Sequence, residues 1–382
     1  MDRRTFHRSL LFSTIAAPLV SAGPAQARPV RGVPRRSVFE FGLPLAEQTH
    51  ELVKVPGLTL LLVSQMSNSH LVKARLDPAT EQVIATRAHP VGGEQAMLHG
   101  LALSRRYPGL VWATQQGDNR LLLIDPNGAD VDAPPLVLSV IDVPAPGRGP
   151  HYIGEYGDQL WVSLKESNHV LEIDHTNPSS FHLYEAHPNP IFVAQHPVSG
   201  EFYASQDDSS QILRINAHTQ QAGQLDIPPE HGRTPVGLIA DPTALWVALL
   251  GTQEQGTGTF GRIDANGDTT WFRLKSSEVA DAGLLHIAFE PGNTSRPSAW
   301  LLGSSIICDD VYDVVVRVIF DAGYNEVLGE EVTVLPTQHC KAHRLLPLSR
   351  SLYVTELTSS TLAQLTTISW DRPTDPAPGD PS

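Results

Sequence analysis

The sequence predicts an all-β protein, a seven-bladed β-propeller whose blades each contain four strands. The first observation is a recurring pattern: a β-type run around a Trp or Tyr, a polar turn, a second β-type run, and then Asp or Asn. Its aromatic members lie about 40–55 residues apart, the spacing typical of propeller blades: Trp112, Trp161, Tyr203, Trp246, Trp300 and Tyr353. The second observation is that 29 Gly and 31 Pro in 382 residues favour short strands joined by turns.

Each repeat is expected to supply four strands. A short apolar run such as HGLALS or IFVAQH precedes the aromatic residue and is predicted to form the innermost strand. The pattern itself gives the second and third strands, and a looser run such as VLSVIDVP gives the outer edge. The apolar alternation is of the β type, without a helical period. We expect the Trp and Tyr residues to be core residues that pack one blade against the next.

The ring is predicted to close through an N-terminal strand. The seventh repeat, LYVTELTSSTLAQLTTISW, ends after its third strand, so the run SVFEFGLPL at 37–45 is expected to supply the fourth. Such a closure removes two free sheet edges at once. The propeller should therefore span residues 37–370, and the proline-rich segment 371–382 is expected to be disordered.

The first 36 residues have the composition of a targeting segment. Residues 1–27 join a basic start, a short apolar core and small residues at 25–27, which predicts a signal peptide and hence a secreted or secretory-pathway protein. Residues 28–36 (RPVRGVPRR) form a basic linker, or a propeptide that ends in a dibasic processing site typical of fungal secreted proteins. The sequon at Asn293 predicts glycosylation.

Composition also excludes several partners. The net charge of -14, without a basic stripe, argues against nucleic acid. No later apolar stretch is long enough to span a bilayer, so we expect no membrane anchor after signal cleavage. Two cysteines exclude a disulfide scaffold. Cys308 and Cys340 both lie near the end of the ring and are expected to form one inter-blade disulfide in an exported protein. The acidic run at 308–313 is predicted to be an exposed loop.

The repeated motifs P-H/V-x-I, LWVT and N-x-I/L-x-x-I-D resemble the streptogramin (virginiamycin B) lyase family over nearly the whole mature chain. The resemblance implies an active site at one mouth of the central channel, where inner strands begin and second strands end. In that family a histidine acts as general acid/base, a second histidine positions the substrate, and glutamates hold magnesium. The enzyme opens a cyclic depsipeptide by elimination. The resemblance places these two histidines on His343 and His286.

The chain departs from this family at its metal site. Lys341 stands where the family has a metal-binding glutamate, Glu356 is an inexact match for the other, and the first-blade tyrosine is absent near Gly57. Because magnesium prefers oxygen ligands, we expect neither a metal nor another cofactor at this mouth, with Lys341 polarising a substrate carbonyl instead. The alternative is zinc or iron bound by His286 and His343 with Asp207 or Glu356.

The inner strands are expected to begin at seven equivalent positions, of which four are histidines: Gly57, His99, His151, Ile191, Val236, His286 and His343. Catalysis is assigned to His343, Lys341 and His286. Substrate binding is assigned to His99, His151, Gln116, Lys165, Asp207 and Glu356. The alternative for each histidine is a hydrogen-bonded structural role, and for each polar tip residue simple exposure to solvent at a turn.

Three functions remain open for a small-molecule substrate. A metal-independent cyclase is favoured, because a cycloaddition needs only an apolar funnel, orientation and one hydrogen-bond donor. In architecture the chain is similar to fungal hetero-Diels–Alderases of tropolone–sesquiterpenoid biosynthesis. The alternatives are a C–O lyase that opens cyclic depsipeptides, and a ligand-binding propeller without catalysis. Oligomeric state is not predicted.

Overall fold

The computed structural model describes residues 37–291 and 297–366. The predicted signal peptide, the linker at 28–36, the sequon at Asn293 and the tail at 371–382 lie outside the described residues. Among the described residues, no helix is long and apolar enough to cross a membrane.

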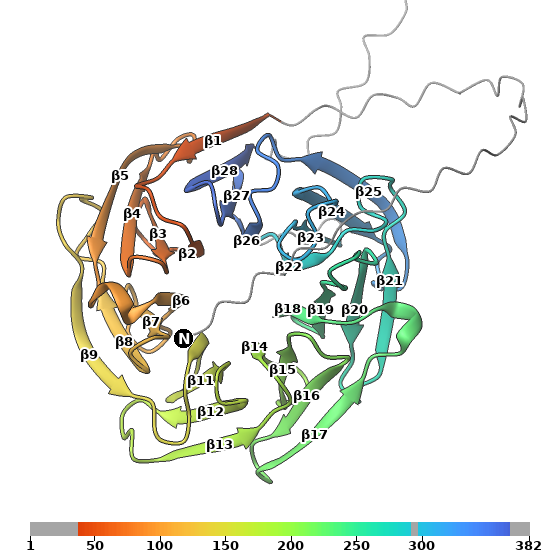
Figure 1. Cartoon of the computed structure of the whole chain (residues 1–382), viewed down its shortest axis with the longest axis horizontal. Coiled ribbons are helices and arrows are strands. Elements are labelled where there is room, and N and C mark those ends of the chain that lie inside the picture. Colours follow the sequence, from red (N-terminus) through yellow and green to blue (C-terminus); the bar gives the residue numbers. More distant parts are fainter. Residues whose placement is uncertain (1–36, 292–296, 367–382) are drawn as a thin grey trace, which may run out of the picture. The chain divides into compact units, whose positions relative to one another are not determined.

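The described strands form seven antiparallel sheets of four strands, arranged as blades around an axis (Figure 1). The inner strands are β2 (Thr49–Lys54), β6 (Leu98–Leu103), β10 (Pro150–Tyr156), β14 (Pro190–Gln195), β18 (Pro235–Ala240), β22 (Leu284–Ala288) and β26 (Ala342–Pro347). The second strands are β3 (Leu60–Gln65), β7 (Val111–Gln115), β11 (Gln159–Leu164), β15 (Phe202–Gln206), β19 (Leu245–Leu249), β23 (Ser298–Gly303) and β27 (Ser351–Glu356). This confirms the predicted seven-bladed propeller.

The outer half of each blade completes the sheet. The third strands are β4 (His70–Leu76), β8 (Arg120–Asp125), β12 (His169–Asp174), β16 (Gln211–Asn216), β20 (Thr259–Ile263), β24 (Val314–Phe320) and β28 (Thr361–Thr366). The outer strands are β5 (Val83–Pro90), β9 (Leu136–Asp142), β13 (Phe181–Glu185), β17 (Gln221–Asp226), β21 (Thr269–Arg273), β25 (Val327–Val334) and β1 (Val38–Gly42). Blades are numbered 1 to 7 from β2 onward. The described residues also form two short 3-10 helices, Glu94–Ala96 and Pro229–His231.

Blade 7 closes the ring as the sequence predicted. Its sheet has the order β1-β28-β27-β26, and β1 pairs with β28 from Val38 opposite Leu365 to Gly42 opposite Thr361. The Glu40 carboxylate on β1 accepts hydrogen bonds of 2.8 Å from the backbone N–H and the hydroxyl of Thr337, in the segment between β25 and β26. The first and last strands of the ring therefore lie side by side in one sheet.

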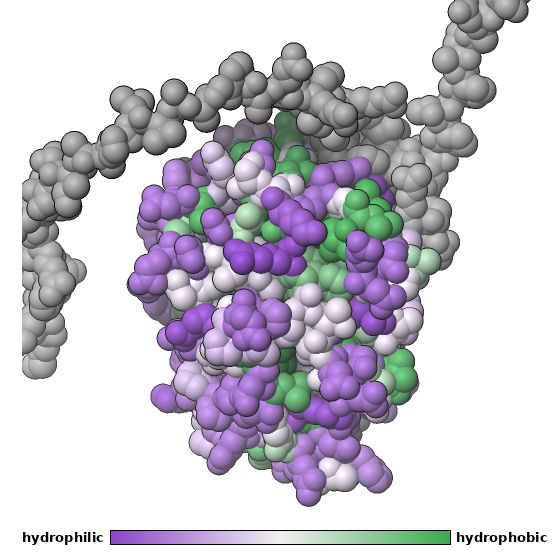
Figure 2. Space-filling model, turned by 90° about the vertical axis from the view of Figure 1, so that its right-hand side faces the viewer, coloured by the Kyte–Doolittle hydropathy of each residue, from purple (hydrophilic) through white to green (hydrophobic). Residues whose placement is uncertain are grey.

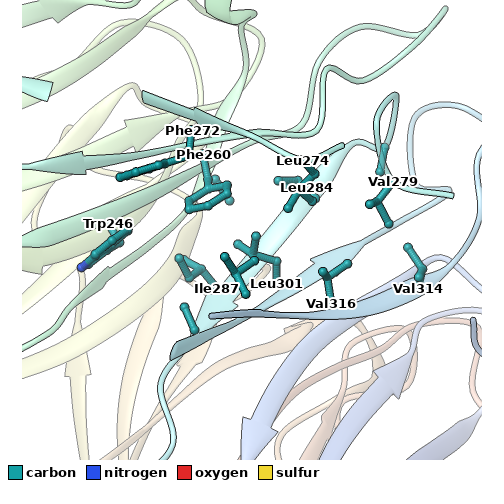
Figure 3. Close-up of a cluster of buried hydrophobic side chains, with 14 of the residues drawn as sticks. Trp246, Phe260, Phe272, Leu274, Val279, Leu284, Ile287, Leu301, Val314 and Val316 are labelled. Atoms are coloured by element: carbon teal, nitrogen blue, oxygen red, sulfur yellow. The ribbon is translucent and has the colours of Figure 1, made fainter. Parts of the chain in front are cut away.

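The aromatic repeat residues form the core, as predicted. Trp112, Trp161, Trp246 and Trp300 are at most 1% exposed. Three of these indole N–H groups are satisfied by carboxylates at 2.9 Å, including Trp246 by Asp241. Figure 3 shows the largest apolar cluster, in which Trp246 and its neighbours pack blade 5 against blade 6. The rim of the ring near β21 and β25 is mostly hydrophilic, with scattered hydrophobic patches (Figure 2).

The position of the first inner strand differs from the prediction. This strand was expected to begin at Gly57, within the run VPGLTL at 55–60, but the structure uses Thr49–Lys54, and Gly57 lies in the following turn with φ of 75°. The sequence THELVK has a weak apolar pattern because His50 and Glu51 occupy its start. Both residues lie at an irregularity in the strand, so the usual two-residue alternation does not apply to them.

The predicted disulfide between Cys308 and Cys340 is not formed in this structure. Both are buried free thiols. The Cys308 thiol donates to the Glu254 carbonyl at 3.3 Å, while Cys340 packs between blades 6 and 7. The acidic run is also not simply an exposed loop. Asp313 is fully buried, and its carboxylate accepts from the backbone N–H groups of Cys340 at 3.0 Å and Ala342 at 2.9 Å, which fixes the start of β26.

Candidate functional site

Every inner strand contains a β-bulge near its first residue, where two residues face one residue of the second strand. The first bulge residues are His50, His99, His151, Ile191, Val236, Leu285 and His343. The second bulge residues are Glu51, Gly100, Tyr152, Phe192, Gly237, His286 and Arg344. His286 is therefore not equivalent to the other predicted histidines, because Leu285 occupies the corresponding position in blade 6.

Hydroxyl groups on the second strands fix these bulges. Ser64, Thr114, Ser163, Ser205 and Thr355 each accept a hydrogen bond of 2.8–3.1 Å from the N–H of the second bulge residue in their own blade. Four of these hydroxyls also donate to the carbonyl of the first bulge residue in the next blade, those of His50, His99, His151 and Ile191. The backbone of three histidines is thus held from the neighbouring blade.

Four histidines form a continuous arc around the axis, which we call the histidine arc. Ring centroids are 4.0 Å apart between His343 and His50, between His50 and His99, and between His99 and His151. The four side chains come from blades 7, 1, 2 and 3, and the residues are only 2–7% exposed. His50 was not predicted. Its strand begins with THEL, which has a histidine at the second position, as do LHGL, PHYI and AHRL at the starts of three other inner strands.

The histidine arc has few hydrogen-bond partners among the described residues. The Nδ1 atom of His99 lies 3.0 Å from the carbonyl of His151. Both ring nitrogens of His343, and the Nδ1 atoms of His50 and His151, are buried and have no hydrogen-bond partner there. Burial lowers the pKa of all four, to about 3 for His99, and neighbouring positive charge lowers it further. The arc therefore consists of neutral imidazoles at pH 7.

Arg344 lies next to the arc as a second bulge residue and reaches across the axis. Its Nε atom lies 3.0 Å from a carboxylate oxygen of Glu51, and one terminal nitrogen donates to the carbonyl of His343 at 3.0 Å. Its guanidinium carbon lies 4.5 Å from the ring centroid of Phe192, which belongs to blade 4. Arg344 is 2% exposed, so this cation is desolvated and held by an ion pair and an aromatic face.

The turns after the second strands add charged groups on the face where the inner strands begin. Lys165 lies 3.4 Å from the Asp207 carboxylate, and both side chains are about one-third exposed. The amide of Gln116 donates to Glu166 at 3.2 Å. The charge of Lys165 is one of the causes that lower the pKa values of His50, His99 and His151. The backbone N–H of Lys165 donates to the carbonyl of Gly149 at 2.9 Å, two residues before His151, which brings Lys165 near the arc.

Three other predicted residues lie differently from the expectation. His286 lies next to the arc, and its Nδ1 atom accepts from the Leu345 N–H at 3.3 Å. Lys341 is half-buried with φ of 54°, and its backbone N–H donates to the Ser305 hydroxyl of blade 6 at 3.3 Å. Glu356 is fully buried and its carboxylate accepts from Ser359 and Thr361, so it does not face the arc. Burial raises the pKa of Glu356 to about 7.

The residues around the arc do not fit the magnesium ion that the family resemblance implies. The groups without partners are nitrogen atoms, whereas magnesium prefers oxygen. The nearby carboxylates of Glu51 and Asp207 are paired with Arg344 and Lys165, two cations that would repel the ion. Within residues 37–291 and 297–366, no group of three or more His, Cys, Asp or Glu side chains is arranged to hold a metal.

The fold and the arc define a seven-bladed propeller with a histidine-lined axis. No family model matches the sequence, and no curated protein matches it. Among solved structures, the fold is similar to a catalytically inactive virginiamycin B lyase from Staphylococcus aureus with quinupristin, with a TM-score of 0.67 and 16% identity over 87% of this chain and 99% of that one. A streptogramin B lyase structure gives 0.66 and 15%, over 87% and 98% of the two chains.

The same fold also occurs with other activities. Hydrazine synthase from Kuenenia stuttgartiensis matches with a TM-score of 0.62 and 14% identity, over 88% of this chain and 99% of that chain. At such low identity these similarities establish the fold alone. Function has to be argued from the residues of the site.

Proposed function

We propose that this chain is a lyase-like enzyme that acts on a small organic substrate at the histidine arc, with His343 as general base. The observation that carries the proposal is that both ring nitrogens of His343 are buried without a hydrogen-bond partner among the described residues. Burial lowers its pKa, which keeps the imidazole neutral at pH 7 and also makes it a weaker base than a free histidine. A neutral imidazole has a lone pair ready to accept a proton. The similarity to streptogramin lyases agrees with this reaction class at the level of the fold only.

The proposed reaction is a β-elimination of a cyclic ester. His343 takes the proton from the carbon next to a carbonyl group, and the electron pair left behind forms a carbon–carbon double bond. The bond between the β-carbon and the ester oxygen breaks, and that oxygen leaves as part of a carboxylate. Lys165 would stabilise the negative charge that develops on the carbonyl oxygen. The proton then passes from His343 to solvent, and no water is consumed.

A second candidate is the metal-independent cyclisation, of hetero-Diels–Alder type, in fungal natural-product biosynthesis. The observation that favours it is the apolar remainder of the ring, since the first bulge residues opposite the arc are Ile191, Val236 and Leu285, all buried. A cycloaddition transfers no proton and needs orientation plus a hydrogen-bond donor, which a neutral imidazole N–H supplies. For either candidate we propose export through the secretory pathway, on the strength of residues 1–27.

The test is incubation of the purified chain with quinupristin, followed by mass spectrometry and ultraviolet absorbance. Elimination yields a ring-opened isomer of unchanged mass with a new conjugated double bond, whereas hydrolysis adds the mass of one water. We expect His343→Gln to lower kcat by about 10²–10⁴-fold. The matched control His182→Gln, on the outer strand β13 where the His182 ring lies 4.3 Å from that of Tyr184, should retain full activity.

A parallel incubation with a quinone methide and a polyene tests the second candidate. Faster or stereoselective cycloaddition that depends on the arc would favour cyclisation over elimination. Absence of turnover in both reactions would overturn both candidates and leave a ligand-binding propeller.

A further inference from the structure

The histidine arc leaves several buried polar atoms without partners. Four ring nitrogens, two of His343 and one each of His50 and His151, have no hydrogen-bond partner among the described residues. Buried polar atoms without partners are destabilising by about 1–3 kcal/mol each, and most in native proteins are satisfied by protein, water or ligand. Four such nitrogen atoms in one arc indicate that a polar ligand binds there in the functional state.

The charges around the arc determine the sign of that partner. Arg344 forms an ion pair with Glu51, and Lys165 forms an ion pair with Asp207 in the partly exposed turns after the second strands. The other titratable groups packed against the arc are His286, whose pKa burial lowers, and Tyr152, whose pKa burial raises, so both are neutral at pH 7. The carboxylates of Glu51 and Asp207 each have a cation, that of Glu166 accepts from the Gln116 amide, and neutral imidazoles offer N–H donors. The arrangement suits an anion better than a cation.

We propose that the histidine arc, with Lys165 and Arg344 beside it, is a carboxylate-binding site and that one imidazole takes up a proton when the carboxylate binds. The inference rests on the proposed function only for the origin of the ligand, which would be the carboxylate released by the elimination. Binding itself requires no turnover. Proton uptake follows because an opposite charge within about 4–6 Å raises a histidine pKa by about 1–3 units.

The chain's own residues explain why the arc would become charged only with a ligand. Without an anion, Arg344 and the neighbouring imidazoles act together with burial to hold the pKa of His343 well below its usual value. A bound carboxylate reverses the local electrostatic balance and forms a charge-assisted hydrogen bond with the imidazolium. Arg344 is at the same time retained in place by Glu51 and Phe192, so the site has a fixed positive group that needs no rearrangement.

The experiment is isothermal titration calorimetry of the full chain with benzoate, and with benzamide as a neutral ligand of nearly the same shape. Each titration is done at pH of about 6, near the usual histidine pKa, in two buffers with different ionisation enthalpies, which gives the number of protons taken up. We expect benzoate to bind at least about tenfold more tightly than benzamide. Benzoate should also take up a fraction of a proton per site, and benzamide none.

Two variants locate the site. Lys165→Met changes a partly exposed side chain and should weaken benzoate binding by about tenfold without affecting folding. His343→Gln should reduce proton uptake, while His182→Gln on β13 should change neither quantity. The inference is overturned if benzoate and benzamide bind equally, if binding occurs without proton uptake, or if Lys165→Met leaves the affinity unchanged. If quinupristin is opened but benzoate does not bind, this inference fails while the proposed function stands.

Discussion

The two sides of the ring have the same strands and the same bulges, but they are joined by different chemistry. On the histidine side, from blade 7 through blade 3 to blade 4, second-strand hydroxyls tie each blade to a bulge carbonyl of the next one. On the apolar side, between blades 5 and 6, the equivalent positions of the second strands are Ala248 and Leu302. There, blades 5 and 6 are held together by the packing of Trp246 and the aromatic residues around it.

The difference shows that one fold can use hydrogen bonds between blades around the candidate site and close apolar packing between blades elsewhere. Polar side chains around the axis require a fixed backbone, because an imidazole is useful only when its position is set. Hydrogen bonds with defined geometry provide that on the histidine side. On the apolar side close packing is sufficient, and Gly237 lies so near blade 6 that a Cβ atom would come within 2.9 Å of the backbone at His286 and Leu285.

The largest effect is expected on the apolar side. Trp246 is fully buried and its ring lies 5.3 Å from Phe320 and 5.9 Å from Phe272. Trp246→Ala should lower the free energy of unfolding by about 3–5 kcal/mol, as measured by urea denaturation, because it leaves a large cavity. The control Phe39→Ala removes an aromatic ring that is 44% exposed and should change stability by at most about 0.5 kcal/mol. An equal decrease in the free energy of unfolding for the two variants would contradict the conclusion that aromatic packing holds blades 5 and 6 together.

On the histidine side, the next largest effect concerns the Arg344–Glu51 pair. Arg344→Met should lower the free energy of unfolding by about 3 kcal/mol, because it leaves the Glu51 carboxylate in the ring without its cation. The double variant Arg344→Met with Glu51→Met should recover most of this loss in the same denaturation experiment. A double variant as unstable as the single one would mean that the ion pair itself, rather than the uncompensated charge, carries the stability.

A smaller effect tests the hydroxyl contacts. Thr355 donates to the carbonyl of His50 at 2.7 Å, and Thr355→Val keeps the shape but removes that donor. We expect a loss of about 1–2 kcal/mol in thermal or urea unfolding. Thr270→Val, on the exposed strand β21 of the apolar side, makes the same chemical change and should be within about 0.5 kcal/mol of the parent. No difference between the two variants would show that the hydroxyl does not hold the bulge.

The last effect depends on pH and concerns Glu356, next to the ring closure. Burial raises its pKa from 4.5 to about 7, so the folded protein binds a proton that the unfolded chain releases near pH 4.5. The contribution of this carboxyl to stability is therefore present below about 4.5 and is lost as the pH rises to about 7. In urea titrations, Glu356→Gln should flatten the fall in stability between these pH values. A parallel shift of the whole curve, with its slope retained, would point to a different group.

The sequence was informative where a pattern repeats and weak where a residue acts alone. Blade number, the four-stranded blades and the closing strand followed from the period and the aromatic residues. His50 was missed because the bulge interrupts the two-residue alternation that is typical of a strand. The segment THELVK therefore has a weaker strand pattern than the more apolar run VPGLTL that follows it. The same irregularity displaced His286 by one position relative to Leu285.

Side-chain direction was the second limit of the sequence. The Lys341 ammonium and the Glu356 carboxylate are close to His343 in sequence or register, yet the cations near the arc are Arg344 and Lys165. Arg344 follows His343 directly, but its contacts with Glu51 and Phe192 span the ring and depend on the closed tertiary structure. Burial of Asp313 likewise depends on how blade 6 meets the start of blade 7.

The pairing of Val38 with Leu365 affects how the protein folds during its synthesis. Within the ring, β1 leaves the ribosome before all of the other described strands, but its partner β28 is the last of these strands to be synthesised. Until then, β1 has no neighbour and the nascent ring stays open, with six blades able to assemble through local contacts. Ring closure is therefore a long-range and slow event that must wait until β28 has been made, and during this time an unpaired sheet edge is available to other chains.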